Sequence, residues 1–530
     1  MQDSIQKRYS YKLFTNLLGA LMNLITFTFV PRSLGPEGFG KFDFVTTNLT
    51  SFLGILTPGF GTAYFTWISR KGHRENTDVA TGICLYWGLV NVLLLAFFIW
   101  LSVIINFNNT IWPDIPVWVL WLGLCWASLT LFFDLLSYLA DGKGYTIGLE
   151  KIRVGQNLFR LFGLLILFSI GLLNLTSYFL LQISLVAIIV LCLFFWLVSK
   201  NAFSIRYFNY KSYDITKVRE FTSFCINFVK PLLLLSVVGF GLGLFERWFL
   251  QSIGGSSEQG FYSLALRLGA VAMLFTGAMT PILLREFGHA YENNDFPMLR
   301  KLFDKIQIFV FISATVGIFL SIQSSNIIQI FGGDRFSMAI YATSIMFLAP
   351  IHQTFGQLST SLMMVTGQTI LYSKITLFQI LIGFPITYIL IAPARYMVPG
   401  FELGATGLAL KLLIVQILIT NVFLFFNTRY LKISFKYWLW VQIRILSTVC
   451  IIAYLASFIS AAIYPTIYSS WYIPNMLDIS DKIIASILQL ILTGSIYCFL
   501  LIILIYFMPS IAGLSRANIL SLSRKIRQLI

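Results

Sequence analysis

Residues 35–42 read GPEGFGKF, which places Gly35, Gly40 and Lys41 at the spacing of a phosphate-binding P-loop. Such a loop needs Ser or Thr after the lysine to bind Mg²⁺, and this chain has Phe42 there. A P-loop also lies between a strand and a helix, whereas long apolar stretches flank this one on both sides. The stretch is therefore interpreted as a tight turn, because Gly tolerates positive φ and Pro fixes φ.

Polar residues recur at helical spacing in several apolar stretches, and they are candidates for a polar transport path. Close packing of helices explains stripes of small residues equally well. For the amides, a water-filled lumen and an interhelical hydrogen bond are both open. The candidates for the path are Asn16 and Asn23 with Gly19, His352 and Gln353 with Gly356 and Ser359, and the stripe Thr47, Ser51, Gly54, Pro58 and Gly61.

Ionisable residues inside apolar stretches are costly, so they are functional candidates by default. Arg267 and Lys411 are the preferred basic candidates, whereas Arg160 and Lys230 lie near stretch ends, where snorkelling to the interface competes. Arg and Lys are the usual partners of phosphates. Glu246 is the candidate for coupling to an ion gradient together with its neighbour Arg247, and simple ion pairing is the alternative. Asp134 and Asp141 are similar cases.

Composition defines the class of protein that holds these residues. Of the 530 residues, 58% are apolar and 11% are charged, against about 25% charged in a soluble domain. We predict an all-α polytopic membrane protein with about 14 transmembrane helices, each covering a stretch of roughly 20 apolar residues. The expected spans are 10–31, 42–68, 79–106, 116–140, 154–172, 176–199, 223–250, 260–284, 306–331, 337–365, 371–392, 404–427, 437–463 and 483–508.

The charge distribution sets the expected orientation. The net charge is +16, and most Lys and Arg residues fall in alternate loops, which the positive-inside rule assigns to the cytoplasm. The expected location is the inner (plasma) membrane, with both termini cytoplasmic. This bias and attraction to lipid headgroups account for the charge, so no nucleic-acid partner is expected. All six cysteines lie in apolar stretches without a CxxC pair, and no metal or cofactor is expected.

The chain contains an internal repeat. A shift of 220 residues pairs Gly19 with Gly239, Gly35 with Gly255 and Gly40 with Gly260, and a shift of 225 pairs Gly142 with Gly367. We therefore expect two pseudo-symmetric six-helix lobes in the same orientation. Residues 1–222 would form the first lobe and linker and 223–430 the second, and 431–530 would add two transmembrane helices and a basic cytoplasmic tail.

The segments PRSLGPEGFGKFDF, ERWFLQSIGGSSEQGFYSLALRL and PGFELGATGLALKLLIVQ resemble the polysaccharide-exporting flippases. Their superfamily also contains multidrug and toxin extruders and lipid II flippases. The resemblance covers about residues 8–430, and it implies two lobes around a cavity and no enzymatic activity. It implies transport of polyprenyl-pyrophosphate-linked oligosaccharide to the outer leaflet by alternating access. It also implies cavity roles for Arg32, Arg267 and Lys411.

Several partners follow from that resemblance. They are the lipid-linked oligosaccharide, membrane lipids, and a polysaccharide polymerase or glycosyltransferases of the O-antigen, capsule or exopolysaccharide pathways. A cation-coupled multidrug antiporter of the same fold is the alternative function. We expect an acidic, aromatic cavity for such an antiporter and a basic cavity for the flippase.

Overall fold

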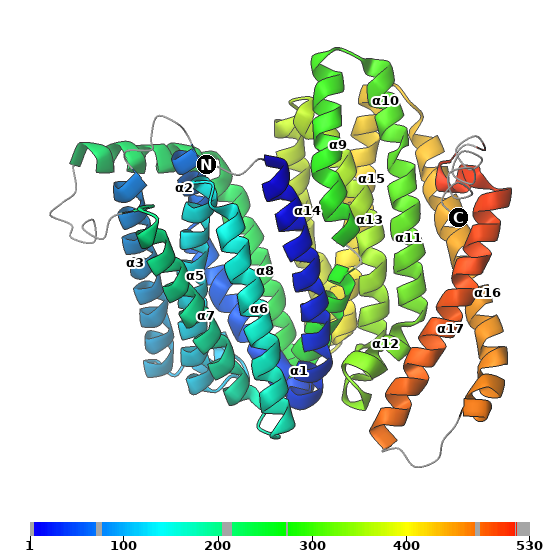
Figure 1. The fold of residues 1–530 in the computed structure, drawn as a ribbon, viewed down its shortest axis with the longest axis horizontal. Coiled ribbons are helices and arrows are strands. Elements are labelled where there is room, and N and C mark those ends of the chain that lie inside the picture. The colour runs from blue at the N-terminus through cyan, green and yellow to red at the C-terminus, as the bar shows by residue number, and fades with distance from the viewer. Residues whose placement is uncertain are drawn as a thin grey trace. The chain divides into compact units, whose positions relative to one another are not determined.

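The computed structural model describes residues 5–69, 77–203, 215–271, 274–471, 478–514 and 516. The regular elements in these ranges are helices (Figure 1). The chain divides into two compact units, residues 1–260 and 261–530. The lobes expected from the repeat have other boundaries, 1–222 and 223–430, and they remain a prediction.

Unit 1 contains seven complete helices and most of an eighth in its described residues. Helices α5, α6 and α7 pack side by side, and α1 packs along both α5 and α6 (Figure 1). The helices are α1 (Ile5–Leu56), α2 (Phe60–Ser69), α3 (Thr77–Ile104), α4 (Asn108–Ile111), α5 (Val117–Gly142), α6 (Thr146–Ser169), α7 (Leu175–Ser199) and α8 (Ile215–Val271), whose last residues belong to unit 2.

Unit 2 is built around α13, which packs against α11 and, most extensively, against α15. Its two last helices, α16 and α17, pack on each other and on α11 and α12. The elements are α9 (Leu274–Glu292), α10 (Phe296–Asp304), α11 (Ile306–Ile322), α12 (Ser324–Phe331), η4 (Asp334–Phe336), α13 (Ala339–Val365), α14 (Thr369–Ile391), α15 (Gly404–Leu431), α16 (Phe435–Trp471), α17 (Asp478–Phe507) and η5 (Pro509–Ala512).

The predicted fold class, an all-α polytopic membrane protein, is confirmed. Among the described residues, ten helical segments are long and apolar enough to cross a membrane. The expected spans 10–31, 42–68, 260–284 and 337–365 do not each give a separate segment by that measure. They nevertheless fall largely on the helical residues of α1, α2, α8, α9 and α13. The expected basic tail beyond Arg516 and linker residues 204–214 lie outside the described residues.

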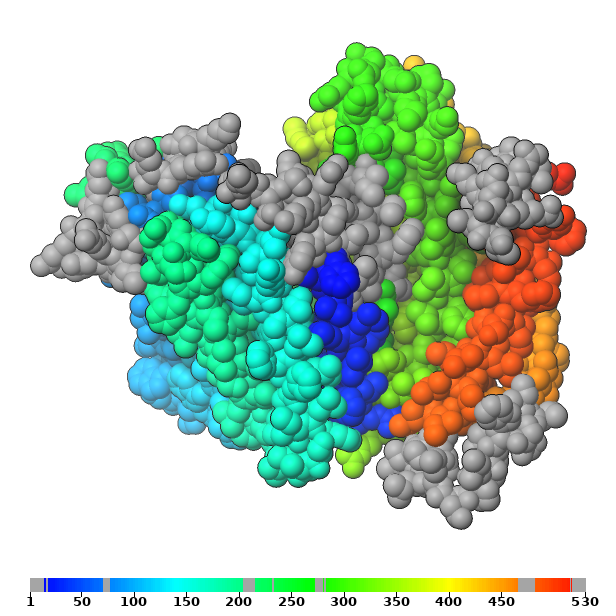
Figure 2. Space-filling view, viewed as in Figure 1, coloured from blue at the N-terminus to red at the C-terminus, as the bar shows by residue number. Residues whose placement is uncertain are grey.

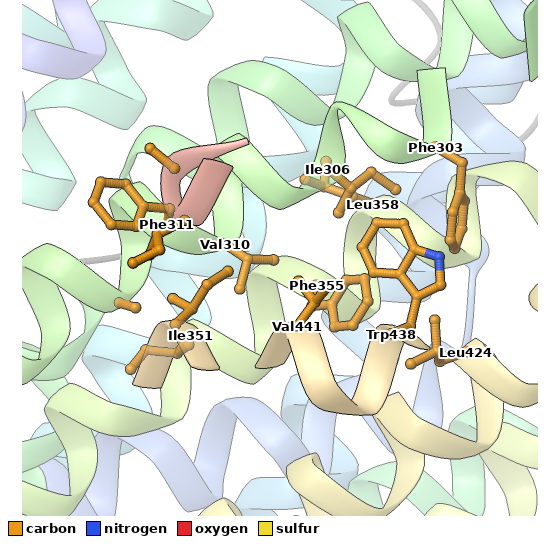
Figure 3. Packing of buried hydrophobic residues seen from close by; sticks show 14 of the residues in the cluster. Phe303, Ile306, Val310, Phe311, Ile351, Phe355, Leu358, Leu424, Trp438 and Val441 are labelled. Atoms are coloured by element: carbon orange, nitrogen blue, oxygen red, sulfur yellow. The ribbon is translucent and has the colours of Figure 1, made fainter. Parts of the chain in front are cut away.

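Each unit has its own aromatic-rich core. In unit 2, the Trp438 ring lies 5.1 Å from the ring of Phe303 and 5.7 Å from that of Phe355, and it fixes α16 against α10 and α13 (Figure 3). In unit 1, the buried Trp67 ring of α2 contacts Phe221 of α8 at 5.3 Å. Along one face of unit 1, the side chains of α6 and α7 form adjoining surfaces (Figure 2).

Candidate functional site

Two glycines separated by 220 residues bend the chain in the same way. Helix α1 changes direction at Gly35, which has φ 68° and ψ 175°, and α8 changes direction at Gly255, which has φ 69° and ψ −171°. Glycine adopts positive φ at little steric cost, so both positions suit it. The register that pairs these two glycines in the sequence is thus reproduced in the backbone.

The second glycine pair of the repeat needs a correction. Gly142 is the last residue of α5, whereas Gly144 follows that helix with φ 84°. Gly367 has φ 74° and follows α13 in the same position relative to the helix end. The structural equivalent of Gly367 is therefore Gly144, because the feature that repeats is the left-handed residue after the helix.

The two kinked turns contact each other reciprocally. A Cβ atom on Gly40 would lie 1.8 Å from the backbone oxygen of Ser256, and one on Gly260 would lie 2.0 Å from the backbone oxygen of Pro36. A shift of 220 residues converts Gly40 into Gly260 and Pro36 into Ser256, so each contact is the repeat of the other. Only residues without a side chain permit this approach of two backbones.

The residue at the metal-ligand position of the apparent P-loop belongs to a hydrophobic core. The ring of Phe42 is buried and lies 4.6 Å from the ring of Tyr178 and 4.8 Å from that of Phe179. The stretch that contains it is helical after Gly35. The near-match to a nucleotide-binding motif is therefore a packed helix start.

A buried ion pair lies beside this turn. Nη1 of Arg247 donates to Oδ2 of Asp43 at 2.8 Å, and the two side chains are 10% and 5% exposed. Sequence reasoning placed Arg247 beside Glu246, which is half-buried in α8, and did not single out Asp43. Any mechanism that releases Arg247 must therefore also break its bond to Asp43. Arg32 is half-buried in α1, ahead of the turn.

The α3–α5 connection supports the second turn. Oδ2 of Asp114 accepts from Oγ of Ser256 at 2.6 Å and from its backbone N–H at 3.3 Å. Nε1 of Trp248 donates to the backbone oxygen of Thr110 at 2.8 Å. Asp114 thus supplies a carboxylate to the start of the helical segment that follows the kink, where N–H groups have no intrahelical partner.

The polar stripe of the first expected span faces α6. Arg160 of α6 donates hydrogen bonds to Oδ1 of Asn23 and, at 3.0 Å, to Oδ1 of Asn157. Gly19 lies against the same Asn157, because a Cβ there would be 3.2 Å from its side-chain nitrogen. The Asn23 amide therefore makes an interhelical hydrogen bond. The side chain of Asn16 lies outside the described residues.

A buried carboxylate lies further along the same helix pair. Glu150 of α6 accepts from Oγ1 of Thr15 at 3.0 Å and from Nη1 of Arg153 at 2.8 Å, and its side chain is 2% exposed. Sequence reasoning counted this part of the chain as a cytoplasmic loop and did not identify Glu150. Its signal in the sequence is the i, i+3 spacing of Glu150 and Arg153.

Unit 1 contains a partly open cavity of about 300 Å³ between α1, α2, α3, α5 and α8, here termed the polar cavity, which both polar and apolar residues line. Asp134 is the one acidic or basic side chain among the described residues that line it. Gly54 and Gly61 of the predicted stripe lie in its wall, where a Cβ would meet the rings of Phe240 and Tyr138 at 2.8 and 2.5 Å. The lining also includes the threonines Thr50, Thr57, Thr62 and Thr130 and the aromatic residues Phe60, Trp87, Tyr138 and Phe240.

In unit 2, the predicted stripe of α13 packs against α15. Oγ1 of Thr420 donates to the backbone oxygen of His352 at 2.9 Å, and Nδ2 of Asn427 donates to that of Ser359 at 2.8 Å. Gly356 adjoins Thr420, since a Cβ there would be 3.0 Å from Oγ1. For Gly356 and Ser359, the stripe is thus a site of close helix packing.

The other predicted residues of unit 2 are partly or fully enclosed. Lys411 of α15 and the His352 side chain of α13 are buried. Gln353 and Arg267 are half-buried, in α13 and in the last part of α8 respectively. Their expected roles in binding substrate remain predictions.

Comparisons with known proteins identify the fold. No protein-family model matches the sequence, and no curated protein matches it. An inward-facing multidrug resistance MATE family transporter of the MOP superfamily is similar in structure, with a TM-score of 0.60 and 16% identity, over 78% of this chain and 95% of that one. The lipid II flippase MurJ in an inward closed conformation is also similar, with a TM-score of 0.61 and 12% identity, over 92% of this chain and 99% of that one.

Both structures are of membrane transport proteins, and their identities to this chain are low enough that the likeness concerns the fold. Together with the apolar helices of both units, it establishes a multi-pass membrane protein. The chain therefore has the fold that these two transport proteins share.

Proposed function

We propose that this chain is a flippase that moves polyprenyl-pyrophosphate-linked oligosaccharide from the inner to the outer leaflet by alternating access. It serves the synthesis of a surface polysaccharide in the cytoplasmic membrane, and both termini are cytoplasmic. A polysaccharide polymerase and glycosyltransferases are its proposed partners, since they would consume and supply the lipid-linked oligosaccharide.

The extent of the structural match supports a flippase. Residues 1–430 make up 81% of the chain (430 of 530), so a match over 92% extends into the region of α16 and α17. The match to the MATE transporter covers 78% and does not require that region. The match to the flippase thus includes part of the chain after residue 430, which the match to the transporter does not require.

The polar cavity of unit 1 is the observation that carries the proposal. The Asp134 carboxylate and several threonine hydroxyl oxygens can accept hydrogen bonds from the hydroxyl groups of a sugar, and aromatic rings offer flat apolar surfaces. Gly54 and Gly61 leave room for the rings of Phe240 and Tyr138 in its wall. Such a lining fits a neutral, hydroxyl-rich head group.

The same cavity favours a second candidate function, a cation-coupled multidrug antiporter. One carboxylate among four aromatic residues attracts an organic cation through charge and through the ring faces. The sequence predicts an acidic, aromatic cavity of this kind for a drug exporter and a basic cavity for the flippase. The two functions therefore differ in whether the charge of Asp134 is required.

The substitution Asp134→Asn separates the two functions, because an amide still exchanges hydrogen bonds with hydroxyls but carries no charge. Vesicles containing the purified chain would be assayed for flipping of a fluorescent lipid-linked oligosaccharide and for uptake of ethidium. Our proposal predicts flipping within about threefold of wild type in Asp134→Asn and loss of flipping in Asp134→Leu. Ethidium transport that disappears in Asp134→Asn, without any flipping by wild type, would establish the antiporter instead.

A further inference from the structure

Unit 1 has a second hollow, a groove of about 480 Å³ between the α1–α2 junction, α3 and α8. Its walls are almost entirely apolar, and Lys230 is the one charged side chain among the described residues that line it. Leu233 and Ile226 are exposed on α8, whereas Phe221 and Cys225 form a buried floor. The groove is therefore open along one side, where hydrocarbon can enter.

The groove adjoins the polar cavity. Thr57, Phe60 and Trp87 belong to the lining of both, so one set of side chains separates an apolar space from a polar one. Trp87 is 42% exposed, and its indole combines a large apolar surface with a single hydrogen-bond donor. An elongated molecule that is apolar at one end and polar at the other would contact both spaces.

Lys230 identifies the charge of that molecule. The exposed ammonium group of Lys230 lies at the edge of this apolar groove, where it can attract the anionic group of a lipid whose chain lies in the groove. Lipid phosphates are the anions that a membrane supplies, and a lysine recognises them as a compact point charge. A phosphate at Lys230 would lie at the edge of the groove that holds its hydrocarbon chain.

We propose that this groove holds the isoprenoid chain of the lipid-linked substrate, with its phosphate at Lys230 and its polar head toward the cavity of Asp134. The inference rests on the proposed function, and it adds the location of the lipid chain and the residue that binds the phosphate. An apolar groove with one cation beside a separate polar cavity suits a lipid with one long chain and a polar head. A phospholipid has two chains, and its small head group would leave the adjoining cavity unfilled.

Binding without transport tests this inference. The full-length chain in detergent would be titrated with a long-chain polyprenyl phosphate and with phosphatidylglycerol, and bound lipid would be counted by native mass spectrometry. Ile226→Trp fills the groove, and Lys230→Gln removes its charge at an exposed position. We expect each variant to weaken polyprenyl phosphate binding by about tenfold or more, and Lys230→Arg to restore it.

Leu89→Trp supplies a matched control. Leu89 is an exposed residue in a separate apolar crevice of about 360 Å³ between α3, α5 and α7. The same added indole there should leave polyprenyl phosphate binding unchanged. If Ile226→Trp unfolds the chain, Lys230→Gln with its Lys230→Arg partner decides the outcome, because that side chain lies at the surface.

Three results would overturn the inference. Lys230→Gln could bind polyprenyl phosphate with wild-type affinity, or Leu89→Trp could lose as much of that binding as Ile226→Trp. Phosphatidylglycerol could also bind as tightly as polyprenyl phosphate, which would make the groove an ordinary lipid site. The proposed function fails separately. A chain that binds polyprenyl phosphate through Lys230 but does not flip lipid-linked oligosaccharide would refute the flippase and leave the groove intact. If the Lys230→Gln variant flips lipid-linked oligosaccharide as fast as wild type, the flippase is supported and the role of Lys230 is refuted.

Discussion

Substituting Gly40 tests the reciprocal contact between the two kinked turns. In Gly40→Ala, the new Cβ would lie 1.8 Å from the backbone oxygen of Ser256 and 2.8 Å from the backbone nitrogen of Gly260. Both neighbours are backbone atoms, so no side chain can rotate away and the turns must separate. Overpacking of this kind costs about 1–3 kcal/mol, and a backbone clash belongs at the upper end.

A gain in helix propensity offsets part of this cost. Alanine is favoured over glycine in a helix interior by about 1 kcal/mol, so the net loss is about 2 kcal/mol. Gly241→Ala provides the matched control, because Gly241 lies in helix α8 and a Cβ there would have nothing within 4 Å. It should be neutral or stabilising by up to about 1 kcal/mol.

Unfolding of the purified chain in detergent, followed by tryptophan fluorescence, measures both variants. Gly40→Ala should unfold at a lower temperature than wild type, and Gly260→Ala should behave in the same way, since its Cβ would lie 2.0 Å from the oxygen of Pro36. The double variant should lose less than the two single losses added together, because both substitutions force the same two turns apart. An unfolding midpoint of Gly40→Ala equal to that of Gly241→Ala would refute the reciprocal contact.

Three further predictions concern charged residues. Asp43→Asn should destabilise the chain by about 3–5 kcal/mol, because it leaves Arg247 buried without its carboxylate, and the Asp43→Asn, Arg247→Gln pair should recover most of that loss in the same unfolding assay. A double variant that is no more stable than Asp43→Asn would contradict a stabilising role for this ion pair. Arg267→Ala should abolish surface-glycan export while membrane insertion, checked by immunoblot of membranes, is retained; normal export would remove it from the mechanism. If Glu246 senses a gradient, Glu246→Gln should flip lipid-linked oligosaccharide at a rate that an imposed pH or sodium gradient no longer changes, and equal stimulation in both proteins would exclude it.

The sequence predicted the features that follow from local composition. Apolar stretches of helical length gave the fold class, because backbone groups in lipid require helices. The gapless register gave the matching conformations of Gly35 and Gly255, since a positive-φ kink restricts its position to glycine. Gly142 was matched to Gly367 incorrectly because the neighbouring Gly144, which has the left-handed conformation, offers the same letter two residues later.

Partners across long sequence separations were not predictable from one sequence. Arg247 lies beside Glu246 in the chain, but its buried partner Asp43 is 204 residues away and becomes adjacent only when α1 and α8 pack. Asp134 had the same sequence signal as Asp141, an acid in an apolar stretch, yet Asp134 lines the cavity. Which face of a helix meets a cavity depends on tertiary packing, so periodicity could mark the candidates but not choose between them.

Transport by the wild-type chain tests the central claim most directly. Purified protein would be reconstituted into vesicles that carry a fluorescent lipid-linked oligosaccharide, and the fraction of label protected from an impermeant quencher would be followed with time. A flippase predicts rapid exchange of label between leaflets that increases with the amount of protein and that a lipid of the same chain without sugar does not show. Exchange no faster than in protein-free vesicles, together with uptake of organic cations by the same preparation, would contradict the account.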